Sequence, residues 1–550
     1  MPETGAAQYL PPLEFAKDIL GADLWSEQQE VLQALPEHQR VAVKSGNGLG
    51  KGYSAAVAVL WFLHCHEPAI VLSTAPTFRQ VRHILWRQIR RLYRKAPDVP
   101  GGKMLDTRWE LPEDRYAMGL SAESADQFQG FHSPNMLIVV DEAHETSFKQ
   151  EDGVRYNARD VAVMRGHFEK VPVILASATP ALESLQMAES GIYEKVDLPS
   201  RFGGAELPAI ELIDLTEEKP PHGMWLAQRL VDGIEERLER GEQSLLFLNR
   251  RGYAPLTLCR NCGFRYQCPN CSAWLVEHRF TRRLACHHCG HEAPAPQACT
   301  ECGEPDCLVA CGPGVERIAD EVAERLPQAR VFVATSDTLN SPGRAAEFIA
   351  AVEAREIDVI VGTQLVTKGF HFPELTLVGV VDADLGLEGG DLRAGERTYQ
   401  QVAQVAGRAG RGSKPGEVLI QTRHPEAPVI AALAAGDRDA FYSAETEMRR
   451  EAGAPPFGRW ASIIISSEDD GEAREAANRL GAFRPDVADC MILGPAPAPM
   501  ALLRGRYRYR FLINARRSVQ LQHVIRRWLT QVDHPAGVRV AVDIDPYSFV

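Results

Sequence analysis

Short apolar runs that end in polar loops recur through two long stretches of the sequence. Residues 1–200 contain such runs at 40–46, 69–77, 136–145 and 171–180, with amphipathic stretches between them. Residues 206–258 and 312–443 repeat the pattern in runs that begin at 244, 330, 357, 375 and 416. Buried strands of this kind form parallel sheets covered by helices, and functional groups gather at the carboxyl ends of the strands. The pattern therefore predicts two α/β lobes.

The rest of the sequence divides around these lobes. A cysteine-rich stretch with few apolar residues interrupts the second set of runs, and the segment after 453–460 has the pattern of a small α+β domain. A chain of 550 residues is long enough for several domains. We expect the first lobe at 1–205, the second at 206–255 and 312–443, a metal-binding insert at 256–311 and a C-terminal domain at 444–550.

The charge and the first residues limit the class of protein. A formal net charge of −13 excludes a uniformly basic nucleic-acid-binding surface but allows a local basic track. The first twenty residues lack the basic start and apolar core of a secretory signal. The longest apolar run, Ala55 to Leu63, is too short to cross a bilayer. We therefore expect a cytoplasmic protein with no membrane partner.

The cysteines are concentrated in the insert. Ten of the 12 lie between Cys259 and Cys311, and disulfides are disfavoured in the cytoplasm, so metal is the better interpretation. Eight of them form CxxC knuckles, in which two thiolates on one turn can hold a zinc ion: Cys259/Cys262, Cys268/Cys271, Cys286/Cys289 and Cys299/Cys302. Eight ligands make two closed, structural sites, and spacing leaves three pairings of the knuckles open. We expect Cys307, Cys311, His287 and His288 to pack or to face solvent.

The stretch Val41 to Ala56 resembles a phosphate-binding loop. Its backbone N–H groups would surround the phosphates of ATP and Lys51 would reach the β and γ oxygens. The expected ATP-binding residues are Gly46, Asn47, Gly48, Leu49, Gly50, Lys51, Gly52 and, further along the chain, Gly369. Gly52 stands where such loops place a Ser or Thr hydroxyl on Mg²⁺, so that the ion keeps an extra water or is reached by Ser54. We expect ATP to bind and to be hydrolysed slowly. The alternative is a glycine-rich turn that binds no nucleotide.

The sequence DEAH follows the apolar run at 136–140. Asp141 suits the Mg²⁺ hydration shell, and Glu142 suits polarisation of the attacking water. Further on, "SATP" (177–180) closes another run, and "QVAQVAGRAGR" (401–411) carries arginines that can stabilise charge on a γ-phosphate. The candidate catalytic residues are Lys51, Asp141, Glu142, His144, Gln404, Arg408 and Arg411.

Two basic segments are candidates for nucleic-acid contact. Residues 78–95 carry six arginines and a lysine on a predicted helix, which either borders a DNA groove or is a solvated basic face. Arg504, Arg506, Arg508 and Arg510 alternate at the period of a strand, so we expect all four on one side. A phosphate track is favoured there over a strand whose arginines pair with carboxylates.

From about residue 145 to the end, the chain resembles the PriA family of replication-restart helicases. The resemblance rests on "TSFKQEDGVRYNARD", "SATPALES", "LLFLNRRGYAP", the eight spaced cysteines, "VGTQLVTKGFHFP", "QVAQVAGRAGR" and the final "DIDPYSF". It implies an α/β fold with two RecA-like parallel-sheet lobes, a two-zinc cysteine-rich insert and a small C-terminal α+β domain. It also implies a superfamily 2 helicase that moves 3′→5′ and uses ATP and Mg²⁺.

The same resemblance assigns further residues. It implies that Cys259, Cys262, Cys299 and Cys302 hold one Zn²⁺ and that Cys268, Cys271, Cys286 and Cys289 hold the other. Phe148 and Lys149 match the family's aromatic-rich loop, where a base can stack. Forked or single-stranded DNA, single-strand DNA-binding protein and primosome proteins are the partners that the resemblance implies.

The first part of the chain departs from that family. Chains of the PriA family begin with a 3′-end-binding domain and a winged helix, and neither is recognised here. Residues 25–142 instead resemble the ATPase lobe of phage terminase large subunits, through "RVAVKSGNGLGKGYSAAVAVLWFL", "STAPTFRQV" and "FQGFHSPNMLIVVDEA". We interpret the chain as a hybrid of the two.

Three functions are compatible with the sequence. The first is an ATP-dependent 3′→5′ DNA helicase of replication restart. The second is a DNA-packaging ATPase, for which a nuclease domain would be expected where the zinc insert lies. The third is a zinc-dependent DNA-binding module that has lost catalysis at Gly52. DNA-stimulated ATP hydrolysis separates the first from the third, and strand displacement separates the first from the second.

Overall fold

The structure is a computed structural model of the whole chain. It describes residues 9–45, 50–96, 99, 101–121, 130–150, 153, 155–198, 208–221, 224–248, 256–259, 264–269, 275–278, 283–286, 291–305, 307–311, 314–335, 337–339, 341–364, 372–387, 392–410 and 414–547. The chain forms two compact units. The first comprises Met1–Ala209, Val366–Thr376 and Ala403–Glu417, and the second comprises Ile210–Leu365, Leu377–Val402 and Val418–Val550.

The first unit is built on an eight-stranded sheet with the strand order β3-β4-β5-β2-β6-β7-β1-β8. The four apolar runs predicted as buried strands form β1 (Arg40–Ser45), β2 (Ala69–Ala75), β6 (Met136–Asp141) and β7 (Val173–Ser177). Neighbouring pairs among these four are parallel. The other strands are β3 (Lys103–Met104), β4 (Arg108–Leu111), β5 (Arg115–Ser121) and β8 (Glu194–Leu198). Parallel strands bring Ser45, Asp141 and Ser177 to one edge of the sheet.

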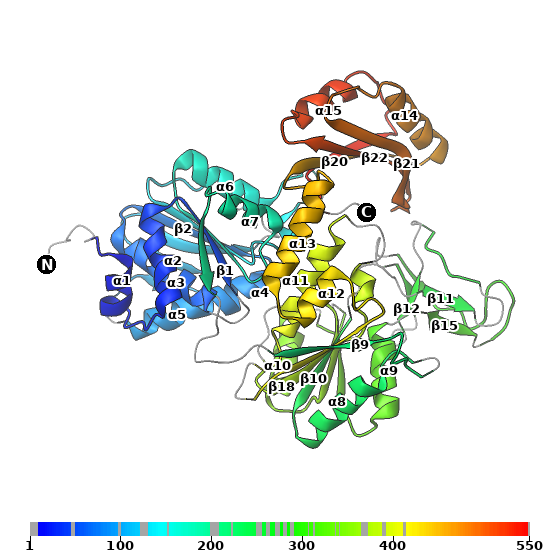
Figure 1. Ribbon diagram of the computed structural model, residues 1–550, viewed down its shortest axis with the longest axis horizontal. Coiled ribbons are helices and arrows are strands. Elements are labelled where there is room, and N and C mark those ends of the chain that lie inside the picture. The colour runs from blue at the N-terminus through cyan, green and yellow to red at the C-terminus, as the bar shows by residue number, and fades with distance from the viewer. Residues whose placement is uncertain are drawn as a thin grey trace. The chain divides into compact units, whose positions relative to one another are not determined.

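Helices accompany this sheet (Figure 1). They are α1 (Pro12–Glu14), η1 (Phe15–Ile19), α2 (Ser26–Glu37), α3 (Lys51–Cys65), α4 (Phe78–Gln80), η2 (Val81–Leu85), α5 (Trp86–Lys95), η4 (Thr146–Phe148), α6 (Ala158–Glu169) and α7 (Leu182–Glu189). Helix α3 is apolar on nearly every side after its first turn, which is typical of a helix buried in a core. It contacts α2, α5 and four strands, so that its first residue, Lys51, is held firmly at the carboxyl edge of the sheet.

The second unit contains a six-stranded sheet with the strand order β16-β17-β10-β18-β19-β9. The five predicted runs form β10 (Gln243–Phe247), β16 (Val331–Ala334), β17 (Val359–Gly362), β18 (Leu375–Val380) and β19 (Glu417–Thr422), and β9 (Ala209–Asp214) adds an edge. The accompanying helices are α8 (Gln228–Glu239), α9 (Val315–Arg325), α10 (Pro342–Glu353), η7 (Asp384–Gly386), α11 (Ala394–Ala406), α12 (Pro428–Ala434) and α13 (Arg438–Glu451). Both predicted α/β lobes are therefore confirmed.

Buried ion pairs join α11 to α13. Arg449 lies 2.8 Å from both Glu396 and Glu445, and the side chains of these three residues are at most 5% exposed. Arg393 lies 3.5 Å from Glu396 and stacks over the rings of Trp460 and Tyr547. Charged groups buried in this way require close mutual pairing. The network fixes the start of α11, the helix whose last turn carries Gln404.

The cysteine-rich segment folds as two small antiparallel sheets. Strands β11 (Leu256–Cys259) and β15 (Leu308–Cys311) form one, and β12 (Val276–His278), β13 (Arg283–Ala285) and β14 (Glu292–Pro294) form the other. In the first sheet Cys259 pairs with Leu308, whereas Cys311 pairs with Leu256 at the opposite end. This register decides which cysteines can meet.

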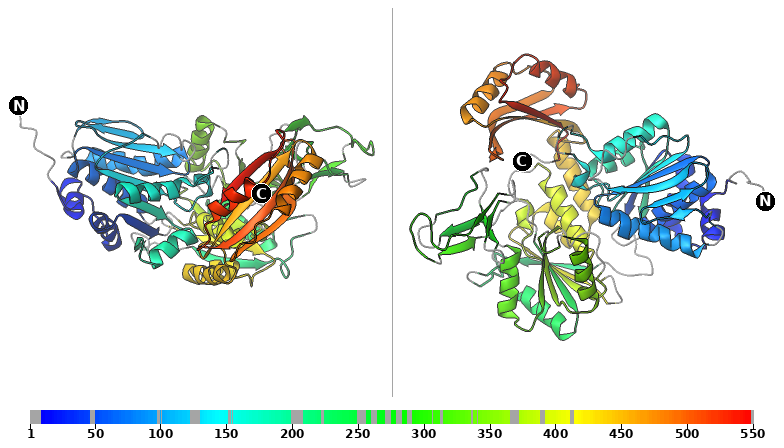
Figure 2. Two further views of the ribbon diagram at one scale, coloured as in Figure 1. Left: turned by 90° about the horizontal axis from the view of Figure 1, so that it is seen from above. Right: turned by 180° about the vertical axis from the view of Figure 1, so that it is seen from behind.

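The C-terminal domain is an antiparallel sheet with the order β21-β22-β20-β23. Its strands are β20 (Gly458–Ser467), β21 (Cys490–Leu503), β22 (Arg506–Arg516) and β23 (Arg539–Ile544). Helices α14 (Asp470–Ala482) and α15 (Leu521–Leu529), drawn in orange and red, accompany this sheet (Figure 2). Ile463, Phe511 and Trp528 belong to the core between sheet and helices. The predicted α+β domain is thus present. In the described part of the chain, every helix is too short or too polar to span a bilayer.

Candidate nucleotide site and zinc region

Lys51 begins α3 and contacts both carboxylates of the DEAH sequence. Its Nζ lies 2.5 Å from Glu142 Oε1 and 3.8 Å from Asp141 Oδ1, and all three side chains are largely buried. Burial by itself lowers the pKa of Lys51, but the charges of Glu142 and Asp141 outweigh that effect and raise it. The ammonium group is therefore charged at neutral pH and is neutralised by the carboxylates beside it.

The pKa values of the two carboxylates are shifted in opposite directions. Burial raises the pKa of Asp141 to about 6, and the nearby Lys51 offsets only part of that rise. For Glu142, burial acts in the same direction, but Lys51 and His144 lower its pKa below the ordinary value. Neither Asp141 Oδ1 nor Glu142 Oε2 accepts a hydrogen bond from a described residue. A buried, under-coordinated pair of carboxylates fits Mg²⁺, which prefers oxygen ligands.

The backbone of the turn that carries these carboxylates is strained at Glu142. Glu142 has a φ of +52°, in the left-handed region, where a residue other than glycine is destabilised by roughly 1–3 kcal/mol. The backbone N–H of Ala143 donates to Ala176 O of β7 (3.1 Å), and that of Glu145 donates to Glu142 O (2.9 Å). Such conformations persist where surrounding contacts enforce them, and they are frequent in active sites. Here they direct the side chain of Glu142 toward Lys51.

His144 connects three motifs through hydrogen bonds. Its Nε2 lies 2.7 Å from Gln404 Nε2, which can only donate, and its Nδ1 lies 2.7 Å from Ser177 Oγ, so a ring proton on Nδ1 fits both contacts. The same Nδ1 lies 3.6 Å from Glu142 Oε2. His144, Ser177 and Gln404 are all buried. The sequence reasoning did not name Ser177 as a site residue, although "SATP" was the signal that marked it.

Arg408 belongs to the same unit and is half-buried. Its charge acts on both Lys51 and Glu142, lowering the pKa of each, although it is the smallest of the contributions given for either residue. A guanidinium group is therefore near the Lys51–Glu142 pair. Arg411, Gly369 and the loop residues Gly46, Asn47, Gly48 and Leu49 lie outside the described residues.

The two described glycines of the loop differ in their surroundings. Gly50 has a φ of +86°, a conformation that favours glycine, whereas the nearest atom to a Cβ there would be Gln28 Nε2, the end of a flexible side chain that can move away. Among the described residues, which leave out 46–49, a Cβ on Gly52 would meet only Ile84 Cγ2, at 4.0 Å. The missing hydroxyl at Gly52 is therefore not enforced by crowding. Ser54, the substitute suggested by the sequence, is 1% exposed, and its Oγ has no hydrogen-bond partner among the described residues.

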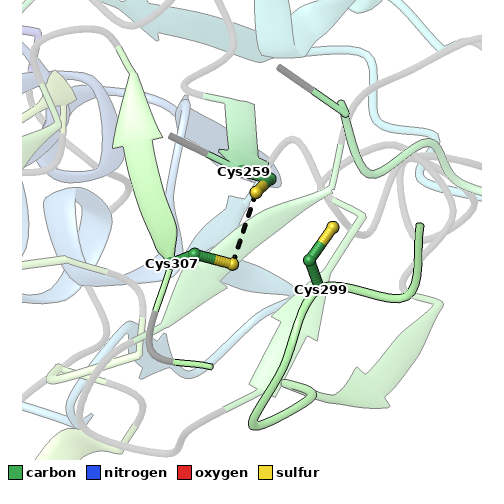
Figure 3. A group of neighbouring side chains, drawn as sticks. All are labelled: Cys259, Cys299 and Cys307. Carbon is green, nitrogen blue, oxygen red and sulfur yellow. Dashed lines mark hydrogen bonds between the residues drawn. The ribbon is translucent and has the colours of Figure 1, made fainter. Parts of the chain in front are cut away.

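Three buried thiols meet in the insert (Figure 3). The Sγ atoms of Cys259, Cys299 and Cys307 lie within 4.8 Å of one another, and Cys302 Sγ is 3.7 Å from Cys259 Sγ. Burial raises the pKa of Cys307 to about 11. Cys268 and Cys286, from the second predicted set, share another buried cluster. Cys262, Cys271 and Cys289 lie outside the described residues, as do His287 and His288. The thiol donors that the structure does describe fit zinc.

The predicted DNA-contact residues are less accessible than the sequence suggested. The ring of Phe148 is 2% exposed and packs in a core cluster, because η4 turns it inward, so it cannot stack a base in this conformation. Lys149 is also buried. On the C-terminal domain, Arg508 is 8% exposed and Arg506 lies 3.2 Å from Glu468, while burial lowers the pKa of Arg510.

Arg504 departs from the expected strand. It has a φ of +50° and, with Gly505, forms the turn between β21 and β22, which begins only at Arg506. The expectation of four arginines on one strand face is therefore wrong for Arg504. Among the four, Arg504 is the one whose side chain is exposed. The helical stretch at 78–95 has its aromatic residue Trp86 fully buried and Arg82 paired with Asp106 at 2.6 Å.

Two sequence families match parts of the chain. The Primosomal protein N C-terminal domain matches residues 450–547, and the PriA DNA helicase Cys-rich region (CRR) domain matches residues 268–294. Among solved structures, RecG bound to a three-way DNA junction aligns with 81% of this chain and 50% of its own, at 12% identity and a TM-score of 0.45, which is too weak a likeness to carry an argument.

Several curated relatives carry the name Replication restart protein PriA. The protein of Rickettsia conorii is 45% identical over 413 residues, which is 75% of this chain and 64% of the relative. That of Rickettsia typhi is 44% identical over 436 residues, 79% of this chain and 67% of the relative. That of Bacillus subtilis is 38% identical over 420 residues, 75% of this chain and 52% of the relative. The chain thus spans about two thirds or less of the length of these proteins, and it belongs to the PriA family of replication restart proteins.

Proposed function

We propose that this protein is an ATP-driven DNA helicase that moves 3′→5′ and acts in the restart of replication at forked DNA. The arrangement of Lys51, Asp141, Glu142 and Arg408 in one unit is the observation that carries the proposal. In this arrangement Lys51 can bind the triphosphate, and Asp141 can hold the metal ion. Glu142 can polarise the attacking water, and Arg408 can stabilise charge in the transition state. The name of the relatives, Replication restart protein PriA, and the match to the PriA DNA helicase Cys-rich region support the choice of DNA as the substrate.

In the proposed reaction, Lys51 exchanges Glu142 for the β- and γ-phosphate oxygens of ATP. Asp141 would hold Mg²⁺, which neutralises charge on the phosphates when it is bound. Glu142, released from Lys51, orients and polarises the attacking water. Its low pKa keeps it ionised for this role. Arg408 stabilises the charge that develops on the γ-phosphate.

His144 is a positioning residue in this proposal. It touches Glu142 on one side and Gln404 and Ser177 on the other, so it can transmit a movement of α11 to the water-activating carboxylate. Movement that accompanies DNA binding would thereby change the rate of ATP hydrolysis. Such a link is what a DNA-stimulated motor requires, because hydrolysis without DNA would be unproductive.

The zinc ions are proposed to be structural. Two closed tetrahedral sites in the insert would leave no open position for a substrate, and their binding energy would hold together small sheets that have little apolar core. The family resemblance pairs the first knuckle with the fourth and the second with the third. The common burial of Cys268 and Cys286 in one cluster supports the inner pairing.

The proposal is tested by ATP hydrolysis and strand displacement, measured on the full chain with zinc. Forked DNA should stimulate hydrolysis, and a duplex with a 3′ single-stranded tail should be unwound in preference to one with a 5′ tail. Arg408→Ala should lower kcat by about 10³-fold with little change in nucleotide affinity. The exposed Arg423→Ala is the matched control and should leave kcat unchanged.

Three results would overturn the proposal. Hydrolysis that DNA does not affect would favour a different NTPase. DNA binding without hydrolysis would favour a non-catalytic binding module. Hydrolysis with translocation along duplex DNA, but no strand separation, would favour a packaging motor.

A further inference from the structure

Helix α11 belongs to both compact units. Its residues up to Val402 are part of the second unit, whereas Ala403 and the rest of the helix are part of the first. Gln404, in the last turn, contacts His144, which also belongs to the first unit. A continuous helix moves as one piece, because each turn is hydrogen-bonded to the next. The contacts that hold the start of α11 therefore bear on the contact between Gln404 and His144 at its end.

Residues of the C-terminal domain hold the start of α11. Arg393, the residue before the helix, is 2% exposed, and its guanidinium lies 4.8 Å from the ring centroid of Tyr547 and 5.7 Å from that of Trp460. A guanidinium within about 6 Å of a ring centroid is attracted to the ring face, more strongly where water is excluded. Trp460 lies in β20 and Tyr547 follows β23, and both fall within the matched family domain at 450–547. Arg393 thus links α11 directly to that domain.

A second attachment joins the same end of the helix to α13. Glu396 lies 2.8 Å from Arg449 and 3.5 Å from Arg393. Arg449 also pairs with Glu445 at 2.8 Å, and all four side chains are at most 5% exposed. The two arginines balance the two glutamates in charge, so removal of one member leaves a buried charge uncompensated. Helix α13 leads into the C-terminal domain, whose first strand begins at Gly458, so both attachments of α11 lead to that domain.

We propose that Arg393 is a positioning residue through which the C-terminal domain controls ATP hydrolysis. When DNA shifts that domain, the rings packed on Arg393 move, the start of α11 follows, and the contact between Gln404 and His144 changes. The inference rests on the proposed function, because it names the source of the movement that a DNA-stimulated motor needs. Arg393 is buried, so we expect it to act without touching DNA.

The test compares ATP hydrolysis with and without single-stranded DNA in variants of the full chain. Arg393→Met removes the guanidinium and one of the cations beside Glu396, so it should lower both stability and stimulation. Adding Glu396→Gln restores the balance of buried charge. We expect this double variant to recover its thermal midpoint, while stimulation by DNA stays about tenfold below that of the unmodified chain and DNA affinity changes by less than about twofold. Recovery of stimulation together with stability would show that Arg393 has only a structural role and would overturn the proposal.

A second pair of variants changes the C-terminal domain instead. Tyr547→Phe keeps the ring face beside Arg393 and should keep stimulation, whereas Tyr547→Leu removes the ring and should lower stimulation about as much as the double variant does. Arg450→Met is the matched control, because Arg450 lies 4.6 Å from the ring centroid of Phe457 and pairs with Glu447 on α13. Its loss removes the same two kinds of contact away from α11 and should leave stimulation unchanged. Equal stimulation in Tyr547→Leu and Tyr547→Phe would count against the role of Arg393.

Hydrogen exchange, measured by mass spectrometry, detects the link without any ATP hydrolysis. In the double variant of Arg393 and Glu396, exchange should quicken both in α11 and in the turn at 142–145, whereas Arg450→Met should leave both segments unchanged. Unchanged exchange at 142–145 in the double variant would overturn the proposal, even if α11 itself exchanged faster. An unmodified chain whose hydrolysis does not respond to DNA would overturn the proposed function, and the exchange result would still decide whether Arg393 acts on that turn.

Discussion

Gln404 Nε2 donates a hydrogen bond of 2.7 Å to His144 Nε2, although 260 residues separate the two in the chain. Both side chains are buried, so the bond is protected from competition by water. It joins the end of α11 to the turn that carries Glu142. A neutral His144 ring that accepts from Gln404 at Nε2 carries its proton on Nδ1, the nitrogen that faces Ser177 and Glu142.

Gln404→Ala should therefore uncouple DNA binding from ATP hydrolysis. We expect stimulation by forked DNA to fall at least tenfold, while nucleotide affinity stays within about twofold, because Gln404 does not touch Lys51. Steady-state hydrolysis with and without DNA, together with fluorescent-nucleotide binding, measures both. Gln401→Ala, on the same helix, is the control. Equal stimulation in Gln404→Ala and the unmodified chain would contradict the coupling role.

Gly52→Thr should speed hydrolysis. Within the described part of the chain, a Cβ at this position has only Ile84 nearby, and the added hydroxyl can replace a water on Mg²⁺. We expect kcat to rise severalfold with little change in KM for ATP. Gly52→Ala adds the same Cβ without the hydroxyl and should have no such effect. Indistinguishable rates in the two variants would rule out the hydroxyl as the missing element.

The burial of Asp141 should make stability depend on pH. Its pKa is about 6 in the folded protein, above its ordinary value of 3.8, so between these values the folded state binds more protons than the unfolded state. The contribution of Asp141 to the free energy of unfolding is therefore fully present below about pH 4, and it is lost as the pH rises through about 6. Asp141→Asn should stabilise the nucleotide-free first unit at pH 8 by at most about 3 kcal/mol, and by roughly half as much at pH 5.

Thermal unfolding of both proteins at pH 5 and pH 8 measures this difference. Asp18→Asn, an exposed aspartate in the same unit, serves as the control and should change stability equally little at both values. A midpoint for Asp141→Asn that is lower than that of the unmodified chain at pH 8 would show that the attraction to Lys51 outweighs the desolvation of Asp141.

Removal of zinc should unfold the insert without unfolding the α/β sheets. Zinc binding contributes on the order of 10 kcal/mol to the folding of small zinc modules, and the two sheets of this insert contain only short strands. After chelation we expect rapid proteolysis within 256–311, while the circular dichroism of the chain changes little. Cys65→Ser and Cys490→Ser, outside the insert, should keep the full zinc content. Undiminished protease resistance in the metal-free chain would be the opposite result.

Arg504→Ala should weaken the binding of single-stranded DNA, because Arg504 is the exposed member of the arginine series. Loss of one phosphate contact should reduce the slope of log K against log salt concentration by about 0.7. Arg517→Ala, an exposed arginine after β22, is the control. Arg508→Ala should instead destabilise the domain, since its guanidinium is buried and donates to Met500 O. An unchanged salt slope in Arg504→Ala would exclude the phosphate contact.

The parts of the fold that were predicted correctly have a strong local signal. Strands such as β6 and β18 are buried along their whole length, and such strands are continuous apolar runs in the sequence. Strands β3 and β4 were missed because they are short, lie at the edge of the sheet and contain exposed or half-buried residues. Edge strands carry polar residues that resemble loops.

The site required information that no local pattern contains. Lys51, Asp141 and Glu142 were predicted from two local motifs, the phosphate-binding loop and DEAH, and the structure adds that the three side chains meet. The part played by Ser177 depends on the tautomer of His144, and the place of Cys307 depends on the register of β11 and β15. The turn at Arg504 and the inward rotation of Phe148 likewise follow from tertiary structure.

The short contact between Lys51 and Glu142 bears on the nucleotide-free state of the proposed ATPase. In the proposed mechanism, Lys51 binds the phosphates of ATP and Glu142 activates the attacking water. In the structure, these two groups form an ion pair with each other. Binding of ATP would therefore move Lys51 from Glu142 to the phosphate oxygens, and the same step would free Glu142 to activate water. Under the proposed mechanism, Lys51 would keep the nucleotide-free protein inactive by engaging the Glu142 oxygen until ATP binds.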